Sequence, residues 1–71
     1  MKRKVKNKEF LDALKSHYRA TRDKSLVTLR LYLDQPLAVA DHEGVIESMS
    51  KLTQQLSEAE ESLKTLETHF E

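Results

Sequence analysis

The side chains with the most obvious chemical potential are the consecutive residues Asp41, His42 and Glu43, each able to ligate a metal ion. Consecutive residues at the start of a helix point in different directions, so they seldom share one ion. An Asp directly before a helix is a common N-cap, and the helix dipole favours acidic residues in the first turn. We therefore interpret the triplet as a helix start and expect no metal site.

Other reactive groups are sparse. His17 and His69 are expected to lie too far apart to form a joint site. The chain has no cysteine, which excludes a thiol nucleophile, a disulfide and a thiolate zinc site. It also lacks a glycine-rich phosphate loop, His-Glu-x-x-His and the Glu-x-x-His pair of di-metal helical bundles. We predict a non-enzymatic protein with no catalytic residue, no cofactor and no small-molecule substrate.

Basic residues cluster near the N-terminus, at Lys2, Arg3, Lys4, Lys6 and Lys8. Lysine and arginine bind nucleic-acid phosphates without regard to base sequence, because they release the counterions that surround the phosphates. Against this interpretation, the chain has no aromatic stacking set and no helix-turn-helix spacing, and its second half is acidic. Non-specific nucleic-acid binding is therefore the alternative to a solvated basic arm.

Length and composition restrict the architecture further. At 71 residues the chain forms one small domain, and a single core of this size supplies only about 3–5 kcal/mol. Small domains often compensate for such low stability with disulfides or a metal ion. Because this chain has no cysteine, we expect it to gain stability by self-association. No apolar run approaches the roughly 20 residues of a membrane span, and the basic start is not followed by the apolar stretch of a signal peptide. We expect a cytoplasmic protein without a membrane partner.

The second half carries the clearest periodicity. Apolar residues recur at alternating intervals of four and three, as at positions a and d of a heptad, from residue 45 to residue 70. They are Val45, Met49, Leu52, Leu56, Ala59, Leu63, Leu66 and Phe70. The positions between them are polar. This pattern predicts a helix over residues 42–70.

Residues 8–34 follow a looser helical pattern, with Asn7 as a candidate cap. The proposed stripe drifts more slowly than a strict heptad and consists of Leu11, Leu14, Tyr18, Arg22, Leu26, Leu29 and Leu33. Pro36 pushes Gln35 out of helical geometry, which ends this helix. Residues 1–7 then form a basic arm and residues 35–41 a loop. Two helices of similar length joined by a short loop predict an antiparallel hairpin, the all-α fold expected here.

The charges are consistent with this hairpin. Ten of the twelve Lys and Arg residues lie within residues 1–30, and nine of the twelve acidic residues lie within residues 31–71. A bend centred on residues 37 and 38 places opposite charges across the helix pair. The first helix is mainly basic and the second mainly acidic, and the bend also places residues of the minority charge together. Asp12 of the first helix falls beside Lys64 of the second, and Asp23 falls beside Lys51. Glu9 is the exception, because it faces another acid, Glu67.

A hairpin leaves apolar residues uncovered beside and beyond the surface between its helices. They are Val27, Leu31, Tyr32, Leu37, Val39 and Ile46. We expect two hairpins to associate through these residues into a homodimeric four-helix bundle, a coiled-coil-like arrangement that covers both faces. Binding of a different protein is the main rival. The apolar loop either caps the bundle or forms the surface that a partner recognises.

The stretch LYLDQPLAVADHEGVIESMSKL, residues 31–52, resembles small uncharacterised proteins of tailed bacteriophages, which carry a loop similar to Asn-Pro-Val-Gly-Val-Gly-Asp-His between two helices. The matching residues are Leu33, Asp34, Pro36, Val39, Asp41 and His42. Ala38 and Ala40 stand where that pattern has glycine. The resemblance implies a phage or prophage accessory protein acting in the host cytoplasm. It implies no activity, so the expected function is binding of a host or viral protein.

Overall fold

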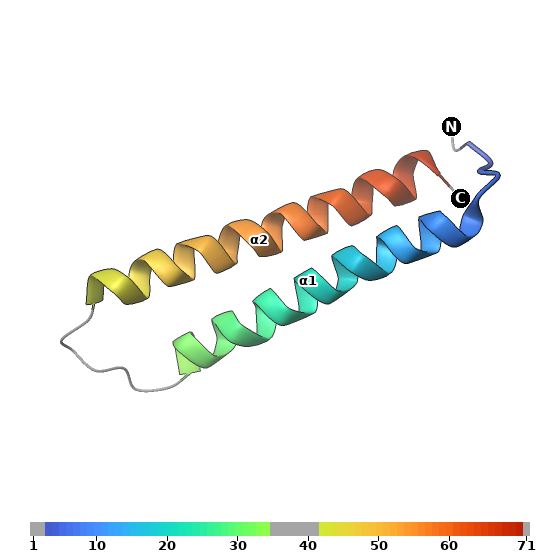
Figure 1. The fold of residues 1–71 in the computed structure, drawn as a ribbon. Helices are drawn as coiled ribbons and strands as arrows, with labels where there is room; N and C mark the ends of the chain where they lie inside the picture. Colours follow the sequence, from blue (N-terminus) through green and yellow to red (C-terminus); the bar gives the residue numbers. More distant parts are fainter. Residues whose placement is uncertain (1–2, 35–41, 71) are drawn as a thin grey trace.

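A computed structural model describes residues 3–34 and 42–70 of the chain. Two α-helices, α1 (Lys8–Asp34) and α2 (His42–His69), run antiparallel and pack along their length (Figure 1). The molecule measures 53 × 18 × 15 Å. The predicted all-α hairpin is confirmed: α1 has the predicted bounds, and α2 ends one residue before the predicted end. Neither helix is long and apolar enough to cross a membrane.

The start of α1 is fixed by Asn7, as expected. The Asn7 carbonyl oxygen accepts hydrogen bonds from the amides of Phe10 at 3.1 Å and Leu11 at 3.2 Å. Asn7 is therefore the N-cap residue, whose carbonyl accepts the first intrahelical bond. The residues expected to shape the bend lie outside the described residues, namely Gln35, Pro36, Leu37, Ala38, Val39, Ala40 and Asp41.

The inner face of α2 is the predicted heptad stripe. Ala59 and Leu63 are buried, with 1% and 6% of their surface exposed. The other six residues of the stripe are half-buried: Val45, Met49, Leu52, Leu56, Leu66 and Phe70. A strict heptad keeps one side of α2 against its partner along the whole length. The prediction for this helix is thus confirmed residue by residue.

The inner face of α1 differs from the prediction. It repeats every seven residues through Leu11, Tyr18, Ser25 and Tyr32, and Ser25 is only 2% exposed. The predicted stripe members Leu14 and Leu33 are 41% and 65% exposed, so these two assignments were wrong. The inner face of α1 therefore has the period of a strict heptad. Ser25 occupies the buried position, whereas the sequence predicted its neighbour Leu26 there.

Three small hydroxyl side chains on or beside this inner face have hydrogen-bond partners. The Ser25 hydroxyl lies 3.5 Å from Oε1 of Gln55 on α2. The half-buried Thr28 donates its hydroxyl to the Lys24 carbonyl at 2.8 Å, and Thr21 donates to the His17 carbonyl at 3.2 Å. Such back-bonding satisfies the hydroxyls within α1. Only three apolar side chains, Leu11, Ala59 and Leu63, are fully buried among the described residues.

The predicted charge pairs do not form direct contacts. Within residues 3–34 and 42–70, the ion pair at contact distance joins neighbours, Arg22 Nε and Asp23 Oδ1, at 3.0 Å. Neither Asp12 with Lys64 nor Asp23 with Lys51 comes within salt-bridge distance. The opposite charges of the two helices therefore act through solvent, where each pair contributes little.

Candidate functional site

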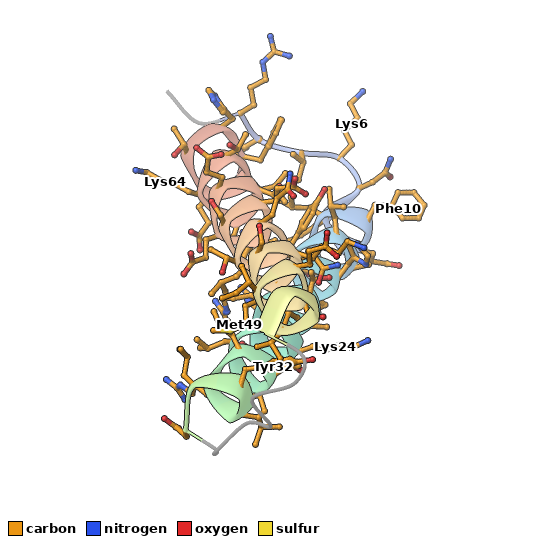
Figure 2. All side chains as sticks on the ribbon, turned by 90° about the vertical axis from the view of Figure 1, so that its left-hand side faces the viewer. Lys6, Phe10, Lys24, Tyr32, Met49 and Lys64 are labelled. Atoms are coloured by element: carbon orange, nitrogen blue, oxygen red, sulfur yellow. The ribbon has the colours of Figure 1, made fainter. Side chains whose placement is uncertain are left out.

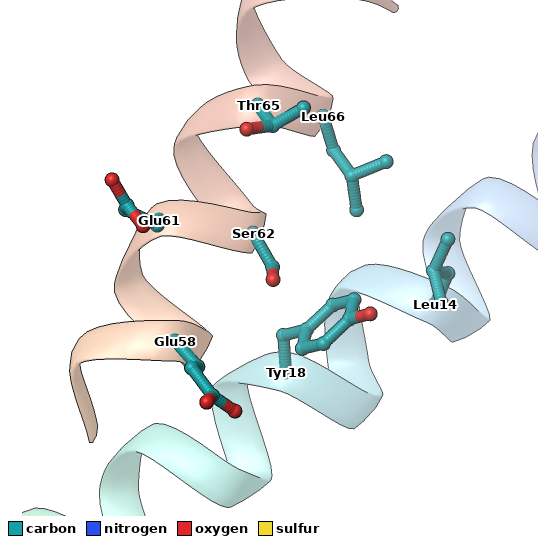
Figure 3. Close-up of a pocket in the computed structure, with 7 residues that line it drawn as sticks. All are labelled: Leu14, Tyr18, Glu58, Glu61, Ser62, Thr65 and Leu66. Carbon is teal, nitrogen blue, oxygen red and sulfur yellow. The ribbon is translucent and has the colours of Figure 1, made fainter. Parts of the chain in front are cut away.

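A shallow groove of about 600 Å³ lies along one side of the helix pair (Figure 3). Leu14 and Tyr18 of α1 line it with five residues of α2, Glu58, Glu61, Ser62, Thr65 and Leu66. The Tyr18 hydroxyl projects toward Leu14, and the Glu61 side chain points away from α1 (Figure 3). The groove follows from the small side chains of Ser62 and Thr65, which leave the space beside the Tyr18 ring unfilled.

This groove does not assemble a reactive group. No hydrogen bond joins any two of the side chains that line it. Nucleophilic catalysis needs a nucleophile within hydrogen-bond reach of a base that a third group orients. The groove instead combines two leucines and a tyrosine with two carboxylates and two hydroxyl side chains.

The histidines are dispersed. The His17 ring lies on the exposed side of α1 and meets the Tyr18 ring edge-on, with centroids 5.2 Å apart. His69 is at the end of α2, where it meets Phe70 in the same way at 6.3 Å. Across the described residues, no three His, Asp or Glu side chains are grouped so that they could hold one ion. Asp41 and the side chains of His42 and Glu43 lie outside the described residues.

The N-terminal basic segment is held against the end of the hairpin. The amide of Arg3 donates a hydrogen bond to the His69 carbonyl at 2.8 Å, and Arg3 pairs with Phe70 as an isolated parallel β-bridge. Val5 is half-buried in this region. The carbonyls of the last helical turn have no partner within the helix, so Arg3 supplies one of the missing donors. The backbone of the segment is thus attached to the end of α2, which the sequence did not indicate.

This attachment leaves the cationic side chains outside. Those of Arg3, Lys4, Lys6 and Lys8 are all exposed, and Lys2 lies outside the described residues. An open pocket of about 410 Å³ lies beneath the segment, between it and the apolar residues Leu11, Leu14, Leu66 and Phe70. The structure therefore presents four cationic side chains at the end of the hairpin where α1 begins and α2 ends (Figure 1).

Large apolar side chains remain exposed on both helices. Of the predicted contact residues, Val27, Leu31 and Ile46 are 54%, 54% and 64% exposed. Tyr32 is half-buried on the inner face of α1, and Leu37 and Val39 lie outside the described residues. The sequence reasoning missed Phe10, which is 74% exposed. Its position directly before Leu11 was the available signal, because neighbouring helical residues point about 100° apart.

No family model matches this chain, and no significant match was found among curated proteins or solved structures. The functional argument therefore starts from these surfaces alone.

Proposed function

We propose that this protein is a non-enzymatic interaction protein whose hairpins associate with one another through exposed apolar side chains, forming an assembly of four helices. The observation that carries this proposal is the contrast between core and surface. Three apolar side chains are buried among the described residues, while Phe10, Val27, Leu31, Leu33 and Ile46 are each more than half exposed.

The energetic argument is one of scale. Fully burying a Leu, Val, Ile or Phe side chain contributes about 1.5–3 kcal/mol. Phe10, Val27, Leu31, Leu33 and Ile46 are each more than half exposed, so a single hairpin does not gain most of this free energy at these five positions. Association of two copies recovers part of it, and small chains without disulfides commonly use this solution.

Sedimentation equilibrium from about one to several hundred micromolar tests the proposal. We expect the weight-average mass to rise toward two chains within this range. The mass of one chain at every concentration would refute self-association. A mass of one chain together with capture of a different protein on the same apolar residues would favour the rival, a heterologous partner.

A phage or prophage accessory role is part of the proposal, and its support is the resemblance at residues 31–52. In such a role the hairpin assembly binds a host or viral protein. Capture of a phage-encoded or host protein on immobilised wild-type chain, lost with Leu31→Ser and retained with Ser50→Ala, supports it. Equal capture by both variants would argue against the apolar surface as the binding element.

Non-specific binding of nucleic acid is the second candidate, and the exposure of Arg3, Lys4, Lys6 and Lys8 on one held segment favours it. Binding should weaken steeply between about 50 and 200 mM salt, because each phosphate contact releases counterions. Lys4→Gln/Lys6→Gln should weaken it, whereas Lys51→Gln/Lys64→Gln, which removes the same charge from α2, should not. Substitution is preferable to deletion, because deletion also removes Val5 and the Arg3 amide. Absence of salt-sensitive binding would reject this candidate.

A further inference from the structure

A second heptad stripe runs along the side of α1 that faces away from α2. Its members are spaced alternately by three and four residues and are all exposed: Phe10, Ala13, His17, Ala20, Lys24, Val27 and Leu31. We call this set the outer stripe. Phe10 and Lys24 project to the same side of the molecule, and Lys64 of α2 projects to the other side (Figure 2). A stripe with this spacing is the surface that a helix presents to a second helix in a coiled coil.

The size pattern of the first six members of the outer stripe, from Phe10 to Val27, matches its own reverse; Leu31 falls opposite residue 6 of the second copy, which precedes α1. In an antiparallel pair of α1 helices, one register places Phe10 opposite Val27 of the second copy and Ala13 opposite Lys24. The same register places His17 opposite Ala20, and every pair then occurs twice about the twofold axis. Each alanine faces a long or aromatic side chain, so large and small residues interdigitate. The Lys24 stem covers Ala13 while its ammonium group reaches solvent.

Charges beside the outer stripe fit the same register. Glu9 and Arg30 lie on one flank of the stripe, both exposed, and neither forms an ion pair within the described hairpin. In antiparallel coiled coils, flanking positions of the same kind face each other across the interface. The register that pairs Phe10 with Val27 therefore brings Glu9 beside Arg30 of the second copy, twice per dimer.

A parallel arrangement lacks this complementarity. It would place Lys24 opposite Lys24, and like charges directly opposed are unfavourable. It would also place alanine opposite alanine at positions 13 and 20, leaving space beside the larger layers. The antiparallel arrangement satisfies both the volumes and the charges of the exposed stripe.

We propose that the occupant of the outer stripe is the outer stripe of a second copy, packed antiparallel with Phe10 opposite Val27 and with reciprocal Glu9–Arg30 ion pairs. This inference rests on the proposed self-association and specifies its interface. The two α1 helices lie at the centre of the assembly and the two α2 helices flank them. Leu33 and Ile46, which are not on the stripe, take no part in this contact.

Crosslinking tests the register directly, because the natural sequence has no cysteine. Ala13→Cys and Lys24→Cys are prepared as separate variants, mixed, and treated with a short bismaleimide. We expect a covalent dimer from the mixture only. Within the proposed register, two copies of the same variant hold their thiols about 16 Å apart along the helix axis, because the offset is about eleven residues at 1.5 Å each.

Charge reversal tests the ion pairs. Glu9→Arg and Arg30→Glu should each raise the dimer dissociation constant about tenfold, because each replaces two attractive contacts by two repulsive ones. The double variant Glu9→Arg/Arg30→Glu should return it to within about threefold of wild type. Glu60→Arg and Lys64→Glu make the same charge changes on α2 and should leave the constant within about twofold. Failure of the double variant to restore association would overturn the pairing.

The outcomes separate the two proposals. If the wild-type chain sediments as one chain throughout, both the self-association and this interface are wrong. If it sediments as two chains but the mixed cysteine variants do not crosslink, self-association stands and the outer-stripe interface is wrong. Crosslinking of either variant alone as efficiently as the mixture would indicate a parallel or unspecific contact and would also overturn the inference.

Discussion

The backbone amide of Arg3 and the carbonyl oxygen of His69, near opposite ends of the sequence, are joined by a hydrogen bond of 2.8 Å. This bond holds the segment before α1 against the last turn of α2. The side chain of Val5 is half-buried as a result. A positively charged residue at this place is also favourable, since the C-terminus of a helix carries the negative end of its dipole.

Replacing Val5 by Ala should therefore destabilise the hairpin, although the residue lies outside both helices. We expect a loss of about 1–1.5 kcal/mol in the free energy of unfolding, because most of the burial of two methyl groups is lost. Urea denaturation followed by circular dichroism measures this. Lys4→Ala is the matched control, as it is adjacent and exposed. Equal effects of the two substitutions would show that the segment does not pack in solution.

Truncating the buried side chain of Leu63 should greatly reduce the free energy of unfolding. Leu63→Ala is expected to cost about 2–5 kcal/mol, which approaches the whole stability of a chain of this size. The variant should be largely unfolded at low protein concentration, as judged by loss of helical circular dichroism. Leu33→Ala removes the same atoms from an exposed position and should change stability by less than about 0.5 kcal/mol.

Ser25 should tolerate alanine but not leucine. The distance of 3.5 Å between its hydroxyl and Gln55 is long for a hydrogen bond, so Ser25→Ala should leave stability unchanged or raise it by up to about 1 kcal/mol. Ser25→Leu should lower stability by about 1–3 kcal/mol, because the helices meet too closely there for a larger side chain. Ser16→Ala and Ser16→Leu, at an exposed site of α1, give the helix-propensity contribution alone. A stabilising Ser25→Leu would contradict the packing seen here.

The pair Asp12 and Lys64 should show little energetic coupling, because the two side chains are not in contact. A double-mutant cycle with Asp12→Asn and Lys64→Gln is expected to give a coupling free energy below about 0.5 kcal/mol. Chemical denaturation of the four proteins at low salt provides the values. A coupling above 1 kcal/mol would mean that the pair closes in solution.

The inner face of α2 was predictable because its heptad is unbroken from Val45 to Phe70. The inner face of α1 was not, for a physical reason. Apolar residues occur on two sides of this helix. The predicted stripe therefore included Leu26 and Leu33 in place of their neighbours Ser25 and Tyr32. Ser25 is buried because Leu11, Tyr18 and Tyr32, which are spaced from it by multiples of seven residues, face α2. A small side chain at this position allows the two helices to approach closely.

The surfaces followed the same division. Exposure of Val27, Leu31 and Ile46 agreed with the sequence argument, since all three lie off the surface between the two helices. The attachment of the basic segment could not be predicted from charge or periodicity. It depends on the His69 carbonyl lacking a donor in its own helix, which becomes apparent only once the helix end and Arg3 are placed side by side.

The contact between Arg3 and His69 also determines how the hairpin responds to mechanical force. Tension applied between residues 3 and 70 acts across adjacent strands of chain, so it loads this hydrogen bond first and then separates α1 from α2 one layer at a time. The helices are peeled apart and do not slide past each other. Pulling on residues 3 and 70 should thus separate the helices gradually at low force, and the hydrogen bond between Arg3 and His69 should be the first contact to break.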